Sequence, residues 1–186
     1  PNARLAVHPR GARHMIDPSR LVRETVDIYG EAETRRVYGE ILPVPSARVV
    51  EVGEGSALSL AGRTLQFYDA PGHARHHVVL RDGATGHLFA GDSFGISYRE
   101  LDRDGRQFVF PTTSPSQFEP AELRRTLDRM LALEPGAVYL THFGRLEEPA
   151  ARGADLHRLI EAHVALGERA RDAGAERKRV LREGVT

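Results

Sequence analysis

The sequence contains no cysteine and no tryptophan, and it has a single lysine, Lys178. The lack of cysteine excludes a disulfide framework, a thiolate metal site and a cysteine nucleophile. Neither sign of charge is in excess, because 26 Lys and Arg side chains balance 26 Asp and Glu side chains. We therefore expect neither a nucleic-acid partner nor a membrane partner, and no run reaches the roughly 18 apolar residues of a membrane span.

The chain is of ordinary size and is unusual only in its histidine content. Its 186 residues correspond to one domain, which we number 1–186, and suffice to bury a core without cross-links. Nine histidines accompany the one lysine, which directs attention to imidazole chemistry.

Both ends of the sequence suggest a piece of a longer protein. Residues 3–8 form a short apolar stretch that we expect to be a buried strand with no lead-in, and there is no initiator methionine. The last residues form a charged helical stretch without a closing signal. We expect the fold to be incomplete at its N-terminus, and a cytoplasmic location is only the default expectation, since a missing leader could carry any signal.

Helices are predicted on both sides of a strand-rich centre. Apolar residues at helical spacing follow Asp17-Pro18, a favourable helix start, and Gly30 separates this helix from a second over 31–38. A clear helix opens at Pro120, and a C-terminal helical segment is expected over 150–186. A short helix is also predicted over 11–16.

Residues 49–90 have the two-residue hydrophobic period of strands and the turn signals between them, which predicts a mostly antiparallel meander. A further strand is predicted over 137–140, and 93–119 reads as a long ordered loop, of the kind that is often functional. Strands flanked by helices predict an α+β layered domain. The meander strands are predicted over 49–52, 56–60, 63–69, 77–81 and 87–90.

Three polar residues follow predicted strands by the same local design. His73, Asp92 and His142 each come just after an apolar strand and each lie beside a glycine or a turn. A lone histidine after a turn is usually structural, and an Asp in Gly-Asp-Ser is most often a local cap. Together they suggest a shared site on a rigid sheet, whose two imidazoles and one carboxylate suit Zn, Fe or Mn. Asp92 has two oxygens and could bridge two metal ions.

These residues lie in segments that resemble a known family. "DAPGHARHHVVL", "HLFAGDS" and "VYLTHFG" are similar, in this order, to the later metal-binding motifs of the metallo-β-lactamase superfamily. "FPTTSPSQFEPAEL" resembles a subgroup of uncharacterised hydrolase-like members. The resemblance implies an αβ/βα sandwich with one or two zinc ions, with iron or manganese as alternatives. It makes His73 the third histidine of the first metal site, Asp92 the bridging ligand and His142 the last ligand of the second site.

The sequence departs from the family at one important point. The signature His-x-His-x-Asp-His motif is absent, and it would lie upstream of residue 3. Zinc prefers four ligands, so three ligands divided between two positions are too few. We therefore expect this polypeptide alone to bind metal weakly or not at all, and the longer parent to be a binuclear enzyme.

The resemblance implies a hydrolase in which a water activated by the metals attacks an ester, thioester or lactone carbonyl of a small molecule. Asp92 is the expected catalytic residue. An Asp rather than a Cys at this position is more like the thioesterase, lactonase or phosphodiesterase branches than a true β-lactam hydrolase. Two alternatives stay open: a metal-free binding or scaffold domain that has kept the fold, and a mononuclear iron dioxygenase. A homo-oligomer is also open, because exposed sheet edges promote association.

Other histidines and aromatic residues have less specific predictions. His76 and His77 either orient a ligand or are simple strand-end residues. His163 is expected to pack in the core, and His8 and His14 are expected to be structural. Four aromatic residues of the long loop either line a substrate pocket or anchor the loop on the core. They are Phe94, Tyr98, Phe108 and Phe110.

Overall fold

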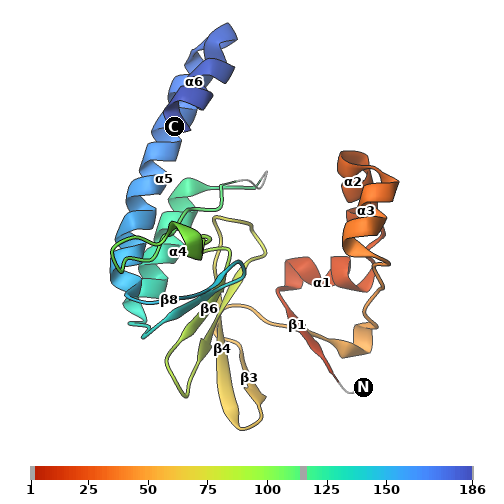
Figure 1. Ribbon diagram of the computed structural model, residues 1–186. Helices are drawn as coiled ribbons and strands as arrows, with labels where there is room; N and C mark the ends of the chain where they lie inside the picture. The colour runs from red at the N-terminus through yellow and green to blue at the C-terminus, as the bar shows by residue number, and fades with distance from the viewer. Residues whose placement is uncertain (1–2, 114–116, 186) are drawn as a thin grey trace.

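The computed structural model describes residues 3–113 and 117–185. Its N-terminal part contains β1 (Leu5–Val7), α1 (Pro9–Ile16), α2 (Ser19–Tyr29) and α3 (Glu31–Tyr38). A 3-10 turn, η1 (Ser46–Arg48), leads into β2 (Val49–Glu51), which pairs with β1 in parallel. Figure 1 shows α2 and α3 standing side by side, away from the larger sheet.

The prediction for residues 49–52 was therefore wrong in one respect. They form a strand, but β2 belongs to a separate two-stranded sheet with β1 and not to the meander. The pairing joins residues more than 40 positions apart, and no local turn signal encodes it. The expectation that residues 3–8 form a buried strand was also too strong, because Ala6 in β1 is exposed.

The main sheet has six strands in chain order: β3 (Ala57–Leu60), β4 (Arg63–Asp69), β5 (Val78–Asp82), β6 (Leu88–Gly91), β7 (Val138–Leu140) and β8 (Gly144–Leu146). All neighbours are antiparallel except β6 and β7, which are parallel. A parallel pair needs a crossover, and here it contains η2 (Arg99–Leu101) and α4 (Pro120–Ala132). Strand β8 was not predicted, because it is only three residues long and begins in a turn.

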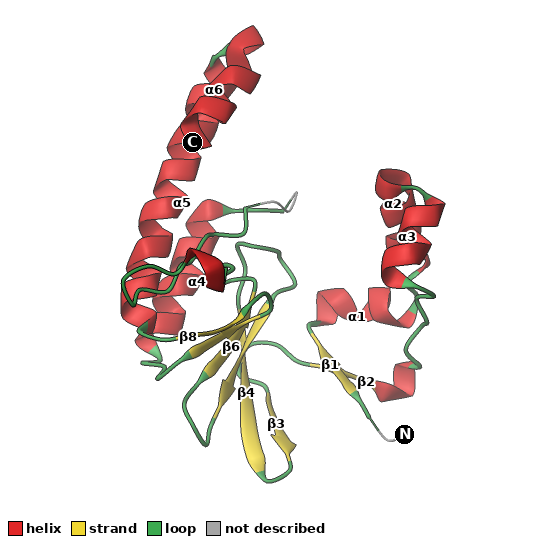
Figure 2. Cartoon of the chain, in the orientation of Figure 1, coloured by secondary structure: helices red, strands yellow, loops and turns green. Residues whose placement is uncertain are grey.

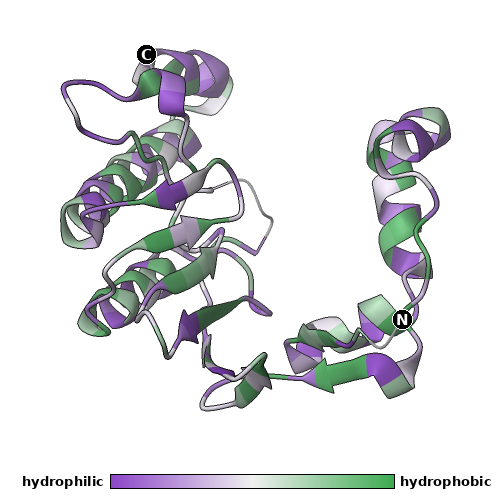
Figure 3. Ribbon diagram, turned by 60° about the horizontal axis from the view of Figure 1, so that its bottom comes forward, coloured by the Kyte–Doolittle hydropathy of each residue, from purple (hydrophilic) through white to green (hydrophobic). Residues whose placement is uncertain are grey.

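The core lies between this sheet and two helices, α4 and α5 (Pro149–Asp172) (Figure 2). Alternation along β6 and β7 places Leu88 and Val138 in the core, fully buried. On the opposite face, the rings of Phe89 and Tyr139 stack 4.9 Å apart, and Phe89 is 47% exposed. The helices thus cover one face of the sheet. Figure 3 shows hydrophobic and hydrophilic residues mixed along the helices, as amphipathic helices require.

The C-terminal region is helical throughout its described length. Helix α5 continues through η3 (Gly174–Glu176) into α6 (Arg177–Val185). Among the residues that the structure describes, no helix is long and apolar enough to cross a membrane.

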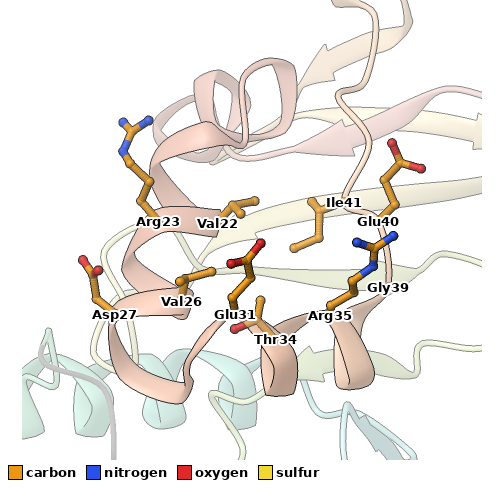
Figure 4. A pocket seen from close by; sticks show the side chains of 10 residues that line it. All are labelled: Val22, Arg23, Val26, Asp27, Glu31, Thr34, Arg35, Gly39, Glu40 and Ile41. Atoms are coloured by element: carbon orange, nitrogen blue, oxygen red, sulfur yellow. The ribbon is translucent and has the colours of Figure 1, made fainter.

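A groove of about 670 Å³ is lined by α2, α3 and residues 39–41, which follow α3 (Figure 4). Val22 and Val26 from α2 and Ile41 beyond α3 supply its apolar walls, and charged side chains such as Arg23 and Glu40 form its rim. Helix α2 has no buried residue, so the α2–α3 pair is only lightly packed. The groove lies apart from the strand ends that carry the predicted site residues.

Candidate metal centre

The three predicted site residues come together at one edge of the main sheet. Asp92 lies between two imidazoles: His73 Nε2 is 3.7 Å from Asp92 Oδ2, and His142 Nε2 is 3.6 Å from Asp92 Oδ1. Topology explains this meeting, because β4, β6 and β7 all run in the same direction and end at the same edge. Each side chain follows the end of one of these strands.

The distances suit shared metal ligands better than direct hydrogen bonds. Both separations are longer than a hydrogen bond between nitrogen and oxygen. Two atoms that each lie about 2.1 Å from one zinc ion can be at most about 4.2 Å apart. In addition, Asp92 Oδ1 is buried and has no hydrogen-bond partner among the described residues. The donor set therefore fits one imidazole and one carboxylate oxygen at each of two metal positions.

This set is incomplete. Within residues 3–113 and 117–185, no group of three or more His, Asp or Glu side chains is arranged to hold one metal ion. Each position would have two protein ligands, whereas zinc sites in proteins usually have three or four. Either position would need ligands in addition to His73, Asp92 and His142 before it could bind a metal ion tightly.

His77 holds the Asp92 loop in place without facing the metal positions. Its Nε2 accepts the backbone N–H of Asp92 at 3.1 Å, so its Nδ1 carries the proton. That Nδ1 donates to Ser93 Oγ at 3.1 Å, and the Ser93 hydroxyl donates to the carbonyl of Ala70 at 3.2 Å. The neutral His77 ring thus links the Asp92 loop to the start of the His73 loop. Of the two roles predicted for His77, this contact favours the one in which it orients Asp92, itself a predicted ligand.

Gly91 is needed at the end of β6 because of the His77 ring. Its φ of +54° lies in the left-handed region, and a Cβ there would come 2.4 Å from His77 Cε1. The glycine beside Asp92 therefore permits both the turn and the close approach of the ring.

Thr112 makes a second link between the ligand loops, and it was not predicted. Its carbonyl lies 3.2 Å from His73 Nδ1, which places the His73 proton on Nδ1 and leaves Nε2 free to face Asp92. Its hydroxyl donates to the carbonyl of Asp92 at 2.7 Å. Thr112 lies 20 residues beyond Asp92, in the FPTTSPSQFEPAEL segment whose family resemblance was noted, but nothing in that segment assigned it a role beside the ligands.

The four loop aromatics divide between the two predicted roles. Phe94 is fully buried in the core, and Phe110 packs edge-on against His163 of α5 at 5.0 Å, so both anchor the loop. Tyr98 packs on Phe143 at 4.7 Å, and Phe143 follows His142 directly. Phe108 lies behind Tyr98 at 6.3 Å. Tyr98 and Phe143 therefore supply an apolar wall beside His142, which is itself 54% exposed on its side chain.

His76 lies on the other side of the same loop, among imidazoles. Burial and the nearby rings of His8, His14 and His73 lower the pKa of His76 below its usual value. His8 is structural, as predicted, because its Nδ1 accepts the backbone N–H of Arg10 and caps α1.

The buried His77 predicts a loss of stability in acid. Burial, followed by the neighbouring His73, lowers the pKa of His77 from 6.5 to about 4. The unfolded chain binds this proton more readily, so the contribution is complete above pH 6.5 and declines as the pH falls toward 4. Between pH values above 6.5 and values below 4, we expect protonation of His77 alone to lower the free energy of unfolding of the metal-free protein by about 3 kcal/mol. Urea titrations at several pH values measure it.

His77→Gln is the matched variant, because its side chain does not titrate. Its unfolding free energy should depend less steeply on pH between 6.5 and 4 than that of the wild type. An unchanged slope in this variant would show that His77 is not the group responsible.

Comparison with known proteins identifies the family. The profile described as the metallo-beta-lactamase superfamily matches residues 2–142, which include all three predicted site residues. The chain belongs to the metallo-β-lactamase superfamily, as its motifs predicted. The α+β fold class and the metallo-β-lactamase type of fold are likewise confirmed by the arrangement of sheet and helices.

Individual relatives are similar over part of their length. The metallo-beta-lactamase fold-containing protein ST1585 of Sulfurisphaera tokodaii is 34% identical over 98 residues, which is 52% of this chain and 33% of ST1585. The crystal structure of ST1585 superposes with a TM-score of 0.61 at 24% identity, covering 97% of this chain and 66% of that one. The chain thus spans a third of its curated relative by sequence and just under two thirds by structure.

More distant solved structures share the fold alone. The metallo-beta-lactamase family protein TTHA1429 of Thermus thermophilus has a TM-score of 0.55 and 22% identity, covering 90% of this chain and 55% of that one. The Flv1 flavodiiron core of Synechocystis sp. PCC6803 has a TM-score of 0.53 and 12% identity, covering 89% of this chain and 38% of that one. The fold is therefore shared by proteins whose names describe different chemistry.

Proposed function

We propose that this chain carries the His73, Asp92 and His142 side of the active site of a metal-dependent hydrolase. Its substrate would be a small molecule with an ester, thioester or lactone carbonyl. The observation that supports this most directly is the position of Asp92, with one imidazole Nε2 facing each carboxylate oxygen. This arrangement suits a carboxylate that bridges two ions with one oxygen toward each.

The residues of this chain would act mainly by holding ligands in position. His73 and His142 would each ligate one ion through Nε2, and Asp92 would ligate both through its two oxygens. When bound, such ions supply a water of lowered pKa and a Lewis acid for the carbonyl oxygen. His77 and Thr112 link the Asp92 and His73 loops, and Tyr98 and Phe143 would offer an apolar contact to a substrate beside His142.

Zinc is the metal that we propose first, and iron is the second candidate. The fold is shared with a flavodiiron protein, and a donor set of histidine and carboxylate also suits iron. An iron site would favour oxygen chemistry, as in the dioxygenase alternative. The metal-free scaffold alternative is motivated by the small number of ligands at each position among the described residues.

Metal binding by the protein of this sequence is the test. Calorimetric titration with Zn²⁺ should show weak binding to the wild type and none to Asp92→Ala, and elemental mass spectrometry should find zinc that is lost on dialysis. Zinc-dependent turnover of a panel of esters, thioesters and lactones would support the hydrolase. Equal binding by both proteins would contradict the site, and iron-dependent oxygen consumption would favour the dioxygenase.

A further inference from the structure

A second pocket, of about 830 Å³, opens beside α1 on the far side of the His73 loop. We call it the α1 pocket. Its walls come from α1, from the start of α2 and from the loop after β4, through residues such as Arg10, Arg13, Arg75 and His76. Gln117 closes one side, and its side chain accepts the backbone N–H of Arg75.

The α1 pocket is strongly basic in a chain whose net charge is zero. Four arginines and one glutamate line it, a formal excess of three positive charges. Glu24 is paired with Arg20 at 2.8 Å, and Arg75 is paired with Glu119 at 2.9 Å. Concentrated charge of one sign in a concave site raises the local concentration of ligands of the opposite sign.

Arg10 and Arg13 have no acidic partner among the described residues. Arg10 Nη1 donates to the carbonyl of Arg75 at 3.3 Å, and Arg13 Nε donates to His14 Nε2 at 3.3 Å. Neither guanidinium lies within ion-pair distance of a described carboxylate, unlike those of Arg20 and Arg75. Because they are three residues apart on α1, both side chains lie on the same face of the helix.

The α1 pocket and the candidate metal centre share one loop. His73 faces Asp92, and His76, three residues later, lines the α1 pocket. The carbonyl of Arg75, between them in the chain, receives the hydrogen bond from Arg10. The α1 pocket and the candidate centre therefore lie on opposite sides of one loop and share no lining residue among those named for the centre.

We propose that the α1 pocket binds the phosphate group of a small-molecule ligand through Arg10 and Arg13. A guanidinium fork matches the geometry of phosphate oxygens. Two neighbouring arginines that both lack an acidic partner favour a dianion over a monoanion. The proposal concerns the pocket alone and holds whether or not the candidate centre is a hydrolase.

The test is the binding of inorganic phosphate to the metal-free protein of this sequence, measured by isothermal titration calorimetry. Wild-type protein should bind phosphate in the millimolar range, with affinity that falls as salt rises, and should bind acetate at least about tenfold more weakly. The double variant Arg10→Gln/Arg13→Gln should lose at least about tenfold in phosphate affinity. Arg36→Gln is the matched control, because Arg36 is exposed on α3, paired with Glu33 and outside the pocket.

Each outcome bears on the proposal separately from the hydrolase function. Absence of phosphate binding, equal binding of acetate and phosphate, or equal losses in the double variant and in Arg36→Gln would overturn it. The single charge reversal Arg13→Glu, with circular dichroism to verify folding, provides a second variant. Phosphate binding would establish the pocket whether or not zinc-dependent turnover is found, and turnover without phosphate binding would remove the pocket and leave the hydrolase.

Discussion

Replacing Asp92 by asparagine is expected to abolish metal-dependent hydrolysis, with a loss of well over a hundredfold. Changes to groups that only orient ligands typically cost about 10- to 100-fold, and Asp92 would be a direct ligand at both positions. Asparagine keeps the size of the side chain but replaces one of the two oxygens with an NH₂ group and removes the charge. The measurement is the rate of zinc-dependent turnover on the ester, thioester or lactone that the wild type hydrolyses.

Asp128→Asn is the control for this experiment. It removes the same charge from an exposed position on α4 that is paired with His157 and lies outside the candidate centre. It should leave turnover and zinc affinity unchanged. Full activity in Asp92→Asn, or equal losses in both variants, would remove Asp92 from the proposed site.

Replacing Gly72 by alanine is expected to destabilise the folded protein by about 4 kcal/mol. The φ of Gly72 is +123°, a conformation that side chains rarely adopt, and a Cβ there would lie 2.3 Å from the backbone nitrogen of Leu123. That atom belongs to the first turn of α4, which cannot move without disturbing the buried Leu123 and Leu127. A loss of this size is a large part of the total stability of a typical domain.

Urea unfolding followed by circular dichroism measures this effect, because the chain has no tryptophan for fluorescence. Gly167→Ala is the matched control: its added Cβ has no neighbour within 4 Å, and it lies inside α5. We expect that variant to be more stable than the wild type by about 0.5–1 kcal/mol. If Gly72→Ala unfolds at the wild-type urea concentration, the close contact with α4 is not rigid.

Local patterns predicted most helices and strands of the main sheet correctly. The strand over 63–69 was predicted with its observed bounds, and the helix opened by Pro120 ends three residues before Pro135-Gly136. These elements have a regular hydrophobic period and clear signals at their ends, so the local sequence is enough to predict them. Gly30 separates α2 from α3 as predicted, because its φ of +80° ends the first helix.

Strand pairing over long distance could not be predicted in this way. Strand β2 has the composition of a meander strand, yet it pairs with β1 across α1, α2 and α3. Hydrophobic alternation shows that a strand has a buried face, but not which other strand lies beside it.

For the candidate centre, the sequence alone determined the candidate ligands. His73, Asp92 and His142 stand out because each follows a strand and a turn, and the family motifs assign them roles. The tertiary structure decided how they meet: three strands that run in one direction bring their ends to the same edge, with Asp92 in the middle. Only folding could reveal that His77 and Thr112 hold these loops together, and that Arg10 and Arg13 lack acidic partners among the described residues. Hydrogen bonds and charge compensation between distant segments depend on three-dimensional proximity, for which spacing along the chain carries no signal.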